Sequence, residues 1–235
     1  TACSPSSLVS VPFTITTPVI TGSALIGHWK FDGNGNNEIT GSPAAQIVGN
    51  ASFKTTGGKL GGYGYIPTGS DYFKVLYNAM FDLPDSFTIE FWFRQRADRS
   101  FLQDLVYKGF GVNNYNFRIY RQLWNENNFG PVIAGHTAAN NGYWTQPSNP
   151  NQLSHNEWHN VVFTKSPNYH AYYLDGALIG SKEVVASYAS DYGGPAKTPP
   201  NDIIIGDTAV DTDFDNLKIY NYALSAAEVS AIGGF

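Results

Sequence analysis

The sequence has one cysteine, no long apolar run and no cluster of basic residues, and each absence excludes a class of protein. Cys3 has no second cysteine to pair with, so no disulfide within the chain can stabilise the fold. No apolar run approaches the ~20 residues that a membrane-spanning helix needs. Charged residues make up only 14% of the 235 residues, with a formal net charge of -5. This balance argues against a general binder of nucleic acids or anionic membranes.

Motifs that mark hydrolases and zinc enzymes are also missing. Neither a Gly-x-Ser-x-Gly turn nor a phosphate-binding glycine loop occurs in the sequence. His155 and His159 are four residues apart, but Glu157 stands at the wrong offset for the zinc motif His-Glu-x-x-His. In an extended segment the two histidines would lie ~13 Å apart, so we expect no zinc here.

What the sequence does have is an alternation of apolar and polar residues, clearest between Ser86 and Arg94. One face carries Phe87, Ile89, Phe91 and Phe93, and the other carries Thr88, Glu90, Trp92 and Arg94. A period of two predicts a half-buried β-strand. Similar runs bounded by turn residues predict strands at 25–31, 72–77, 102–108, 116–120, 160–165, 170–174, 177–179, 202–206 and 215–220.

Strands at this spacing, without long amphipathic helices between them, predict an all-β fold: a two-sheet antiparallel sandwich or jelly roll. Asp175-Gly176 is typical of a two-residue hairpin turn. We expect one short C-terminal helix, because Ser225 and Glu228 form a capping-box pattern. Leu224 and Val229 stand on either side of that cap, where they can form a hydrophobic staple.

Residues 1–23 differ from the rest and are predicted to be an extended linker or edge strand that precedes one domain at 24–235. Pro12 and Pro18 remove backbone donors, which excludes a central strand. Cys3 has two interpretations, the lipidated residue of a bacterial lipoprotein or an incidental cysteine in an extension. Because residue 1 is Thr rather than Met, we expect a processed chain or a larger parent protein.

Four segments carry a family resemblance. They are Leu25-Ile-Gly-His-Trp-Lys-Phe-Asp-Gly33, Phe87-Thr-Ile-Glu-Phe-Trp-Phe93, Glu157-Trp-His-Asn-Val-Val-Phe-Thr164 with Tyr172-Tyr-Leu-Asp-Gly-Ala-Leu-Ile-Gly180, and Phe214-Asp-Asn-Leu-Lys-Ile-Tyr-Asn-Tyr-Ala-Leu-Ser-Ala-Ala-Glu228. In this order they resemble the laminin-G-like members of the concanavalin-A-like lectin/glucanase superfamily. The resemblance implies a two-sheet antiparallel jelly roll over residues 24–235. It implies function only loosely, because such domains bind glycans, bind proteins or act as spacers, and many carry structural calcium.

The resemblance raises the question of catalysis, because some members of the superfamily are glycosidases. Retaining chemistry needs two carboxylates about 5–5.5 Å apart, and the glucanase branch supplies them as Glu-x-Asp-x-x-Glu. None of the glutamates in this chain has an aspartate two residues later. Glu90, on a predicted strand, is interpreted as an outward partner of Arg94 or Arg96 rather than as a catalytic group. We therefore expect no catalytic residue and no enzyme.

Oxygen-rich side chains occur in two segments that the resemblance places close together. Asp211 to Asp215 has acidic residues at the spacing of an EF-hand loop, but Asn216 and Tyr222 stand where that loop needs Gly and Glu. A structural calcium ion is the best chemical candidate. Its predicted ligands are Asp32, Asn34, Glu38, Asp213 and Asp215. The alternative is that these are ordinary solvated turn residues.

Aromatic and amide side chains, which sugar-binding sites use, are concentrated between residues 111 and 152. The predicted ligand-binding residues are Tyr115, Trp124, Asn141, Tyr143 and Trp144. For Trp124 and Trp144 the alternative is packing beneath a long loop. The other tryptophans, Trp29, Trp92 and Trp158, match strand positions of the family and are assigned to packing.

The preferred function is a non-catalytic glycan- or surface-binding adhesion module at an extracellular, cell-surface or virion-surface location, supported by calcium. Its partner would be a carbohydrate or cell-surface glycan, with no nucleic acid and no membrane insertion. The alternative is a structural or assembly module of a virion appendage, pilus or surface layer, which self-associates through the fold and the N-terminal extension. A glycoside hydrolase is disfavoured by the missing carboxylate motif.

Overall fold

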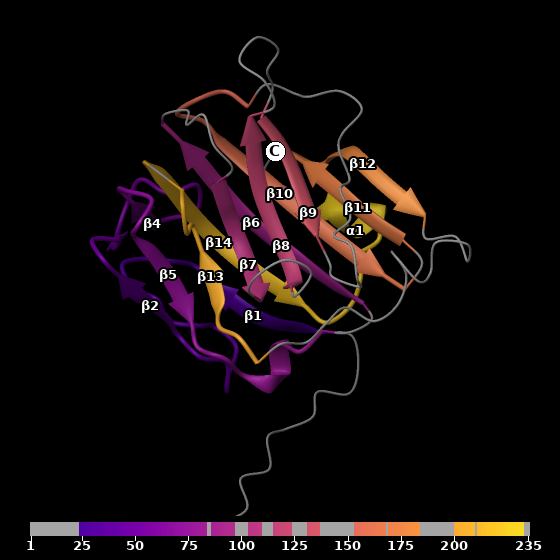
Figure 1. Cartoon of the computed structure of the whole chain (residues 1–235), viewed down its shortest axis with the longest axis horizontal. Helices are drawn as coiled ribbons and strands as arrows, with labels where there is room; N and C mark the ends of the chain where they lie inside the picture. The colour runs from indigo at the N-terminus through magenta and orange to yellow at the C-terminus, as the bar shows by residue number, and fades with distance from the viewer. Residues whose placement is uncertain are drawn as a thin grey trace, which may run out of the picture.

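The computed structural model describes residues 24–83, 86–96, 103–109, 115–123, 131–136, 153–167, 169–183, 200–209 and 211–232. Their strands form two antiparallel sheets that lie face to face (Figure 1). The predicted all-β jelly-roll sandwich with one short C-terminal helix is confirmed. The segment 1–23, with Cys3, lies outside the described residues.

In the described part of the chain, one sheet has eight strands and the other has six. The first sheet runs, in spatial order, β12 (Ala177–Glu183), β11 (Tyr169–Leu174), β10 (Trp158–Ser166), β6 (Phe87–Gln95), β14 (Thr212–Tyr220), β4 (Tyr63–Ile66) and β3 (Ser52–Lys54), with β1 (Leu25–Trp29) also paired to β14. The second runs β2 (Ala45–Val48), β5 (Tyr72–Val75), β13 (Ile203–Ile205), β7 (Gln103–Gly109), β8 (Tyr115–Leu123) and β9 (Pro131–His136). A 3₁₀ turn, η1 (Ala79–Phe81), and the helix α1 (Ala226–Ala231) complete the elements.

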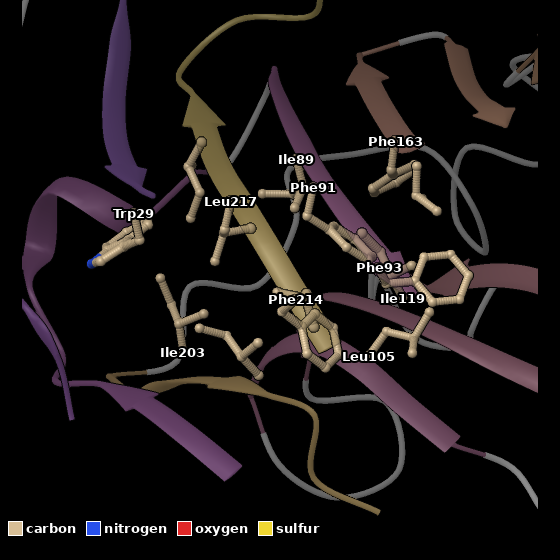
Figure 2. Close-up of a cluster of buried hydrophobic side chains, with 14 of the residues drawn as sticks. Trp29, Ile89, Phe91, Phe93, Leu105, Ile119, Phe163, Ile203, Phe214 and Leu217 are labelled. Carbon is tan, nitrogen blue, oxygen red and sulfur yellow. The ribbon is translucent and has the colours of Figure 1, made fainter. Parts of the chain in front are cut away.

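The core lies between the two sheets and is rich in aromatic side chains. Figure 2 shows Phe91 and Phe214, from neighbouring strands of the eight-stranded sheet, pointing towards Leu105 and Ile119 of the other sheet. All four side chains are at most 1% exposed. Burial of a side chain of this size is worth about 1.5–3 kcal/mol, so the alternation of apolar residues along each strand is the main source of stability.

The alternation in β6 correctly predicts which residues face inward, but the strand is buried on both faces. Thr88, Glu90 and Trp92 point away from the core and are still at most 3% exposed. Other segments of the chain cover them. The Leu224 N–H donates to the Thr88 hydroxyl at 2.9 Å, and the Lys59 ammonium lies 4.2 Å from the Trp92 ring centre.

The helix α1 covers part of the outward face of the eight-stranded sheet. Its predicted capping box is confirmed, since Ser225 accepts from the Glu228 N–H and the Glu228 side chain accepts from the Ser225 N–H. Leu224 and Val229 pack in one cluster with outward residues of β10 and β11, including Val162. The helix therefore does not cover the end of this face where β4, β14 and β6 lie side by side; other segments cover that end.

Four strands, β2, β3, β4 and β9, were not predicted from the sequence. They are short or contain glycine, as in the Tyr-Gly-Tyr-Ile sequence of β4, so they lack a long alternating pattern. The hairpin turn is confirmed, because Asp175 and Gly176 both have positive φ, at 48° and 76°. None of the helices in the described ranges is long and apolar enough to cross a membrane.

Candidate binding face on the eight-stranded sheet

A row of aromatic and charged side chains crosses the outward face of the eight-stranded sheet. Backbone pairing aligns Tyr65 of β4 with Asp213 of β14, Asp213 with Arg94 of β6, and Arg94 with Trp158 of β10. A second row aligns Asp215 of β14 with Trp92 of β6. Neighbouring strands lie ~4.8 Å apart, so these side chains are neighbours on one face of the sheet, called here the Arg94 face, on which Asp213, Asp215 and Trp92 are buried.

Asp213 is a buried residue of the Arg94 face that pairs with both of its arginines. Its carboxylate is fully buried and accepts from Arg94 Nε at 2.7 Å and from Arg96 Nη2 at 2.6 Å. Arg96 also pairs with Asp211 at 3.2 Å, and the Tyr65 hydroxyl donates to the same carboxylate. Charge-assisted bonds of this kind are strong and directional, so both guanidinium groups are held in place.

The Arg94 guanidinium lies against two aromatic rings. Its carbon is 4.6 Å from the centre of Trp158 and 5.4 Å from the centre of Tyr63. The two rings also meet edge to face at 6.2 Å. Contact with both rings restricts the movement of the cation and of the rings. Tyr63 and Trp158 are partly exposed, so these fixed rings are open to a ligand.

A glycine-rich loop, residues 57–62, folds over the neighbouring carboxylates. The Leu60 N–H donates to Asp215 Oδ2 at 2.9 Å, and the Gly62 N–H donates to Asp32 Oδ1. A Cβ on Gly58 would lie 1.7 Å from the Gly62 carbonyl oxygen, so a larger residue cannot replace this glycine without moving the loop. The loop therefore brings Asp32, near the start of the domain, beside Asp215, near its end.

Asp215 is an unusual carboxylate. Burial, together with the nearby charge of Asp32, raises its pKa from 3.8 to about 6. The Asn216 amide donates to Asp215 Oδ1 at 2.6 Å. Asn216 itself has a φ of 49° in the bulge of β14, a conformation that Asn tolerates better than most residues. The bulge thus places an amide donor against a carboxylate that carries an unfavourable buried charge.

The five predicted calcium ligands do not gather in one place. Asp32 and Asp215 lie together under the glycine loop, whereas Asp213 is bound by two arginines. Glu38 pairs with Lys30 at 3.0 Å, and Asn34 accepts from the Asn36 N–H within its own turn. In the part of the chain that the structure describes, no group of three or more His, Cys, Asp or Glu residues is placed to hold a metal ion.

The predicted sugar-binding residues lie mostly outside the part of the chain that the structure describes. Tyr115 begins β8, but its side chain is not among those described. Trp124, Asn141, Tyr143 and Trp144 lie outside the described residues. The packing assigned to Trp29 and Trp92 is confirmed, since they are 0% and 3% exposed, whereas Trp158 is only partly buried.

Glu90 is buried, and both of its carboxylate oxygens accept hydrogen bonds from other side chains. The partner predicted for it, Arg94 or Arg96, is wrong. Glu90 instead accepts from Lys218 Nζ at 2.9 Å and from the Tyr220 hydroxyl at 3.1 Å, both from β14. The sequence pattern identified the outward face correctly, but it could not identify the strand that pairs there. Glu90 thus joins β6 to β14 across the outward face.

His159, of the rejected zinc motif, closes a hairpin instead. Its Nδ1 lies 2.7 Å from Asp175 Oδ2, and Asp175 Oδ1 accepts from the Asn160 N–H at 2.7 Å. Ser154 Oγ lies 3.2 Å from His159 Nε2, but it donates to Glu157. The serine proton therefore points to the glutamate rather than to the imidazole, which does not suit nucleophilic catalysis.

Sequence reasoning gave no role to Lys59, Tyr63 and Tyr65, and it assigned Arg94, Arg96 and Trp158 to structural roles. The available signals were the four glycines between 57 and 62 and the alternation of tyrosines that follows them. Such short patterns occur in many loops. What makes them informative is the pairing of β4 with β14, almost 150 residues later in the chain, which gives Tyr65 its place beside Asp213.

Comparison with known proteins identifies the family of the chain. A family model described as the concanavalin A-like lectin/glucanases superfamily matches residues 67–230, well over half of the chain. The chain belongs to this family. No curated protein matches it.

Solved structures share the fold at low sequence identity. Domain 4 of AbnA, an extracellular arabinanase from Geobacillus stearothermophilus solved with arabinotriose, is 13% identical with a TM-score of 0.70, over 90% of this chain and 99% of that domain. Trypanosoma rangeli sialidase is 15% identical (TM-score 0.59), over 88% of this chain and 32% of the sialidase. The botulinum neurotoxin serotype G binding domain is 14% identical (TM-score 0.56), over 89% and 50%. The chain thus spans about a third of the sialidase and half of the toxin domain.

The raised pKa of Asp215 predicts an unusual dependence of stability on pH. Because the native state holds this proton up to about pH 6 and the unfolded chain releases it near pH 4, stability falls as pH rises between these values. The loss is on the order of 3 kcal/mol. Thermal unfolding in chelator at pH 4 to 7 should show this trend. Asp215→Asn should reduce the slope but not remove it, because burial also raises the pKa of Asp104 and of Asp213. Asp202→Asn should leave the slope unchanged. An equal slope in wild type and Asp215→Asn would contradict the assignment.

Proposed function

We propose that the chain is a non-catalytic glycan-binding module that contacts its ligand through the Arg94 face. The observation that carries the proposal is the Arg94 guanidinium, which packs against Tyr63 and Trp158 and is paired with buried Asp213. Sugar sites combine flat aromatic surface with a few well-placed polar groups, and here both are partly exposed and rigid. Rigid side chains lose little entropy on binding.

The related structures support a carbohydrate partner. One is an arabinanase domain in complex with arabinotriose, and another is a toxin binding domain. Tyr143 and Trp144, predicted from the sequence as ligand-binding residues, are the second proposed contact. The extracellular arabinanase is also consistent with an exported protein that acts at a cell or particle surface.

The chemistry of Glu90 supports a binding role rather than catalysis. A general acid of a glycosidase needs access to the leaving oxygen and a second carboxylate across the bond. Glu90 is 0% exposed, and its two oxygens already accept from Lys218 and Tyr220.

We also propose that Asp32 and Asp215 hold a structural calcium ion. Two adjacent carboxylates, one with a pKa raised by burial and by the other charge, form a site whose electrostatics favour a cation. Calcium prefers oxygen ligands and tolerates irregular geometry. The ion would relieve the charge at Asp215 and hold the glycine loop near the Arg94 face. Asn34, Glu38 and Asp213 would not take part, because their side-chain oxygens bond to other residues of the chain.

Glycan binding is tested by affinity electrophoresis on gels that contain arabinan, xylan, dextran, polygalacturonate or dextran sulfate. The wild-type chain should be retarded by at least one polymer, and Trp158→Ala should weaken that retardation at least tenfold because it removes the nearer of the two rings that pack against Arg94. Leu178→Ala, an exposed apolar residue on β12, is the matched control. Circular dichroism confirms that each variant is folded.

Two results would count against the Arg94 face. One is retardation by none of the polymers. The other is a folded Trp158→Ala variant that binds as well as wild type, while Trp144→Ala loses binding. That second result would move the site to the predicted loops.

Calcium binding is tested by differential scanning calorimetry. Millimolar calcium should raise the Tm of the wild-type chain by several degrees, because a ligand that binds only the native state stabilises it. Asp32→Asn and Asp215→Asn should each abolish the increase, while Glu38→Gln should keep it. An unchanged wild-type Tm in calcium, relative to chelator, would exclude the ion from this site.

A further inference from the structure

We infer that copies of the chain associate by strand addition, in which residues 9–19 of one copy pair with the free edge of β12 in the next. An added strand of this kind is held mainly by backbone hydrogen bonds to the edge that it joins. Residues 9–19 lie outside the described residues, so the donor is argued from its sequence and the acceptor from the structure. The contact is separate from the proposed glycan-binding site on the Arg94 face.

The donor segment alternates between two kinds of residue. The odd positions are apolar or β-branched: Val9, Val11, Phe13, Ile15, Thr17 and Val19. The even positions are polar or proline: Ser10, Pro12, Thr14, Thr16 and Pro18. A period of two in residues that favour extended backbone predicts a strand with one apolar face.

Both prolines of the segment fall on the same edge of that strand. Successive residues of a β-strand direct their N–H and C=O groups to opposite edges. Pro12 and Pro18 are both at even positions, so the edge of the even residues lacks two donors. The edge of the odd residues keeps all of its donors. The segment can therefore join a sheet through its odd edge, and its even edge ends the sheet.

The strand β12 offers a long open edge as the acceptor. It has seven residues and lies at one end of the eight-stranded sheet (Figure 1). Among the described residues, it forms backbone hydrogen bonds with β11 alone. The strands at the other side of the sandwich, β2 and β3, are shorter and already bonded. Ala45 of β2 donates to the Gly35 carbonyl at 2.7 Å, and Lys54 of β3 accepts from the Gly33 N–H at 3.1 Å.

An exposed leucine marks the face of β12 that an apolar strand would cover. Leu178 is 52% exposed. Its partner across the ladder is Tyr173 of β11, which packs in an apolar cluster with Val229 of α1. The apolar side chains of an added strand, on the same face, would cover Leu178 and extend this cluster. Removal of that apolar surface from water favours association.

The segment is too short to pair along its whole length with β12 of its own chain. Ala24, which follows the segment, is held beside the end of β14, where its N–H donates to Asn221 Oδ1 at 2.7 Å. Five strand spacings of ~4.8 Å, ~24 Å in all, separate β14 from the position beyond β12. The chain from Val19 to Ala24 spans at most ~18 Å when it is extended. The acceptor is therefore the β12 strand of another copy.

The contact joins two different surfaces, because each copy donates its segment at one place and accepts a segment at another. Such head-to-tail contacts give closed rings or open chains of copies rather than a symmetric dimer. Because the even edge of the donor carries the prolines, each sheet grows by one strand only.

Sedimentation velocity of the full chain in reducing buffer, which excludes a disulfide through Cys3, tests the association. The wild-type chain should form oligomers as its concentration rises. Thr17→Pro removes a donor from the pairing edge and should weaken association about tenfold or more. Thr16→Pro is the matched control, because it places proline on the edge that already carries Pro12 and Pro18. It should leave association unchanged.

The acceptor is tested by Leu178→Lys, which places a charge on the exposed face of β12 and should also weaken association. Circular dichroism verifies that each variant is folded. An equimolar mixture of Thr17→Pro and Leu178→Lys should form dimers, because each variant supplies the half of the contact that the other lacks.

Three results would overturn the inference. A wild-type chain that stays monomeric at every concentration overturns the association itself. Equal association of Thr16→Pro and Thr17→Pro overturns pairing through the odd edge. A folded Leu178→Lys variant that associates as well as wild type overturns β12 as the acceptor.

Discussion

The pairing of β14 with β6 is the contact on which the rest of the molecule depends. β14, close to the C-terminal end of the described chain, lies between β6 on one side and β4 and β1 on the other. Its inward residues, among them Phe214 and Leu217, enter the shared core shown in Figure 2. Its outward residues meet Arg94 and Glu90 of β6. One strand thus closes the sheet, completes the core and supplies the acidic residues of the candidate site.

The bulge in β14 separates these outward residues into two environments. Before the bulge, Asp213 and Asp215 lie within the Arg94 face and beneath the glycine loop. After the bulge, Lys218 pairs with Glu90, beside the part of the sheet that α1 covers. Buried charges are costly unless they are paired, which is why Asp213 has two arginines and Glu90 has a lysine and a tyrosine. Among the described residues Asp215 has no such cation, and this difference makes it the electrostatically unusual member of the set.

Much of the fold could be predicted from local patterns, and much less of the site. The alternation at 87–94 and the cap at Ser225 act within a few residues, so the sequence alone identifies β6 and α1. Pairing between distant strands leaves no such local signal. The oxygen-rich residues at 32–38 and 211–215 therefore suggested one calcium site. In the structure, Asp213 forms ion pairs with Arg94 and Arg96, and Glu38 forms an ion pair with Lys30. Tyr63 and Tyr65 had no evident role until β4 was placed beside β14.

The most direct test of the account is a crystal structure of the chain, in calcium, with a short oligosaccharide of whichever polymer retards it in affinity electrophoresis. The account predicts sugar residues on the Arg94 face, against Tyr63 and Trp158. An ordered oligosaccharide on another surface, with the Arg94 face free of sugar, would contradict it.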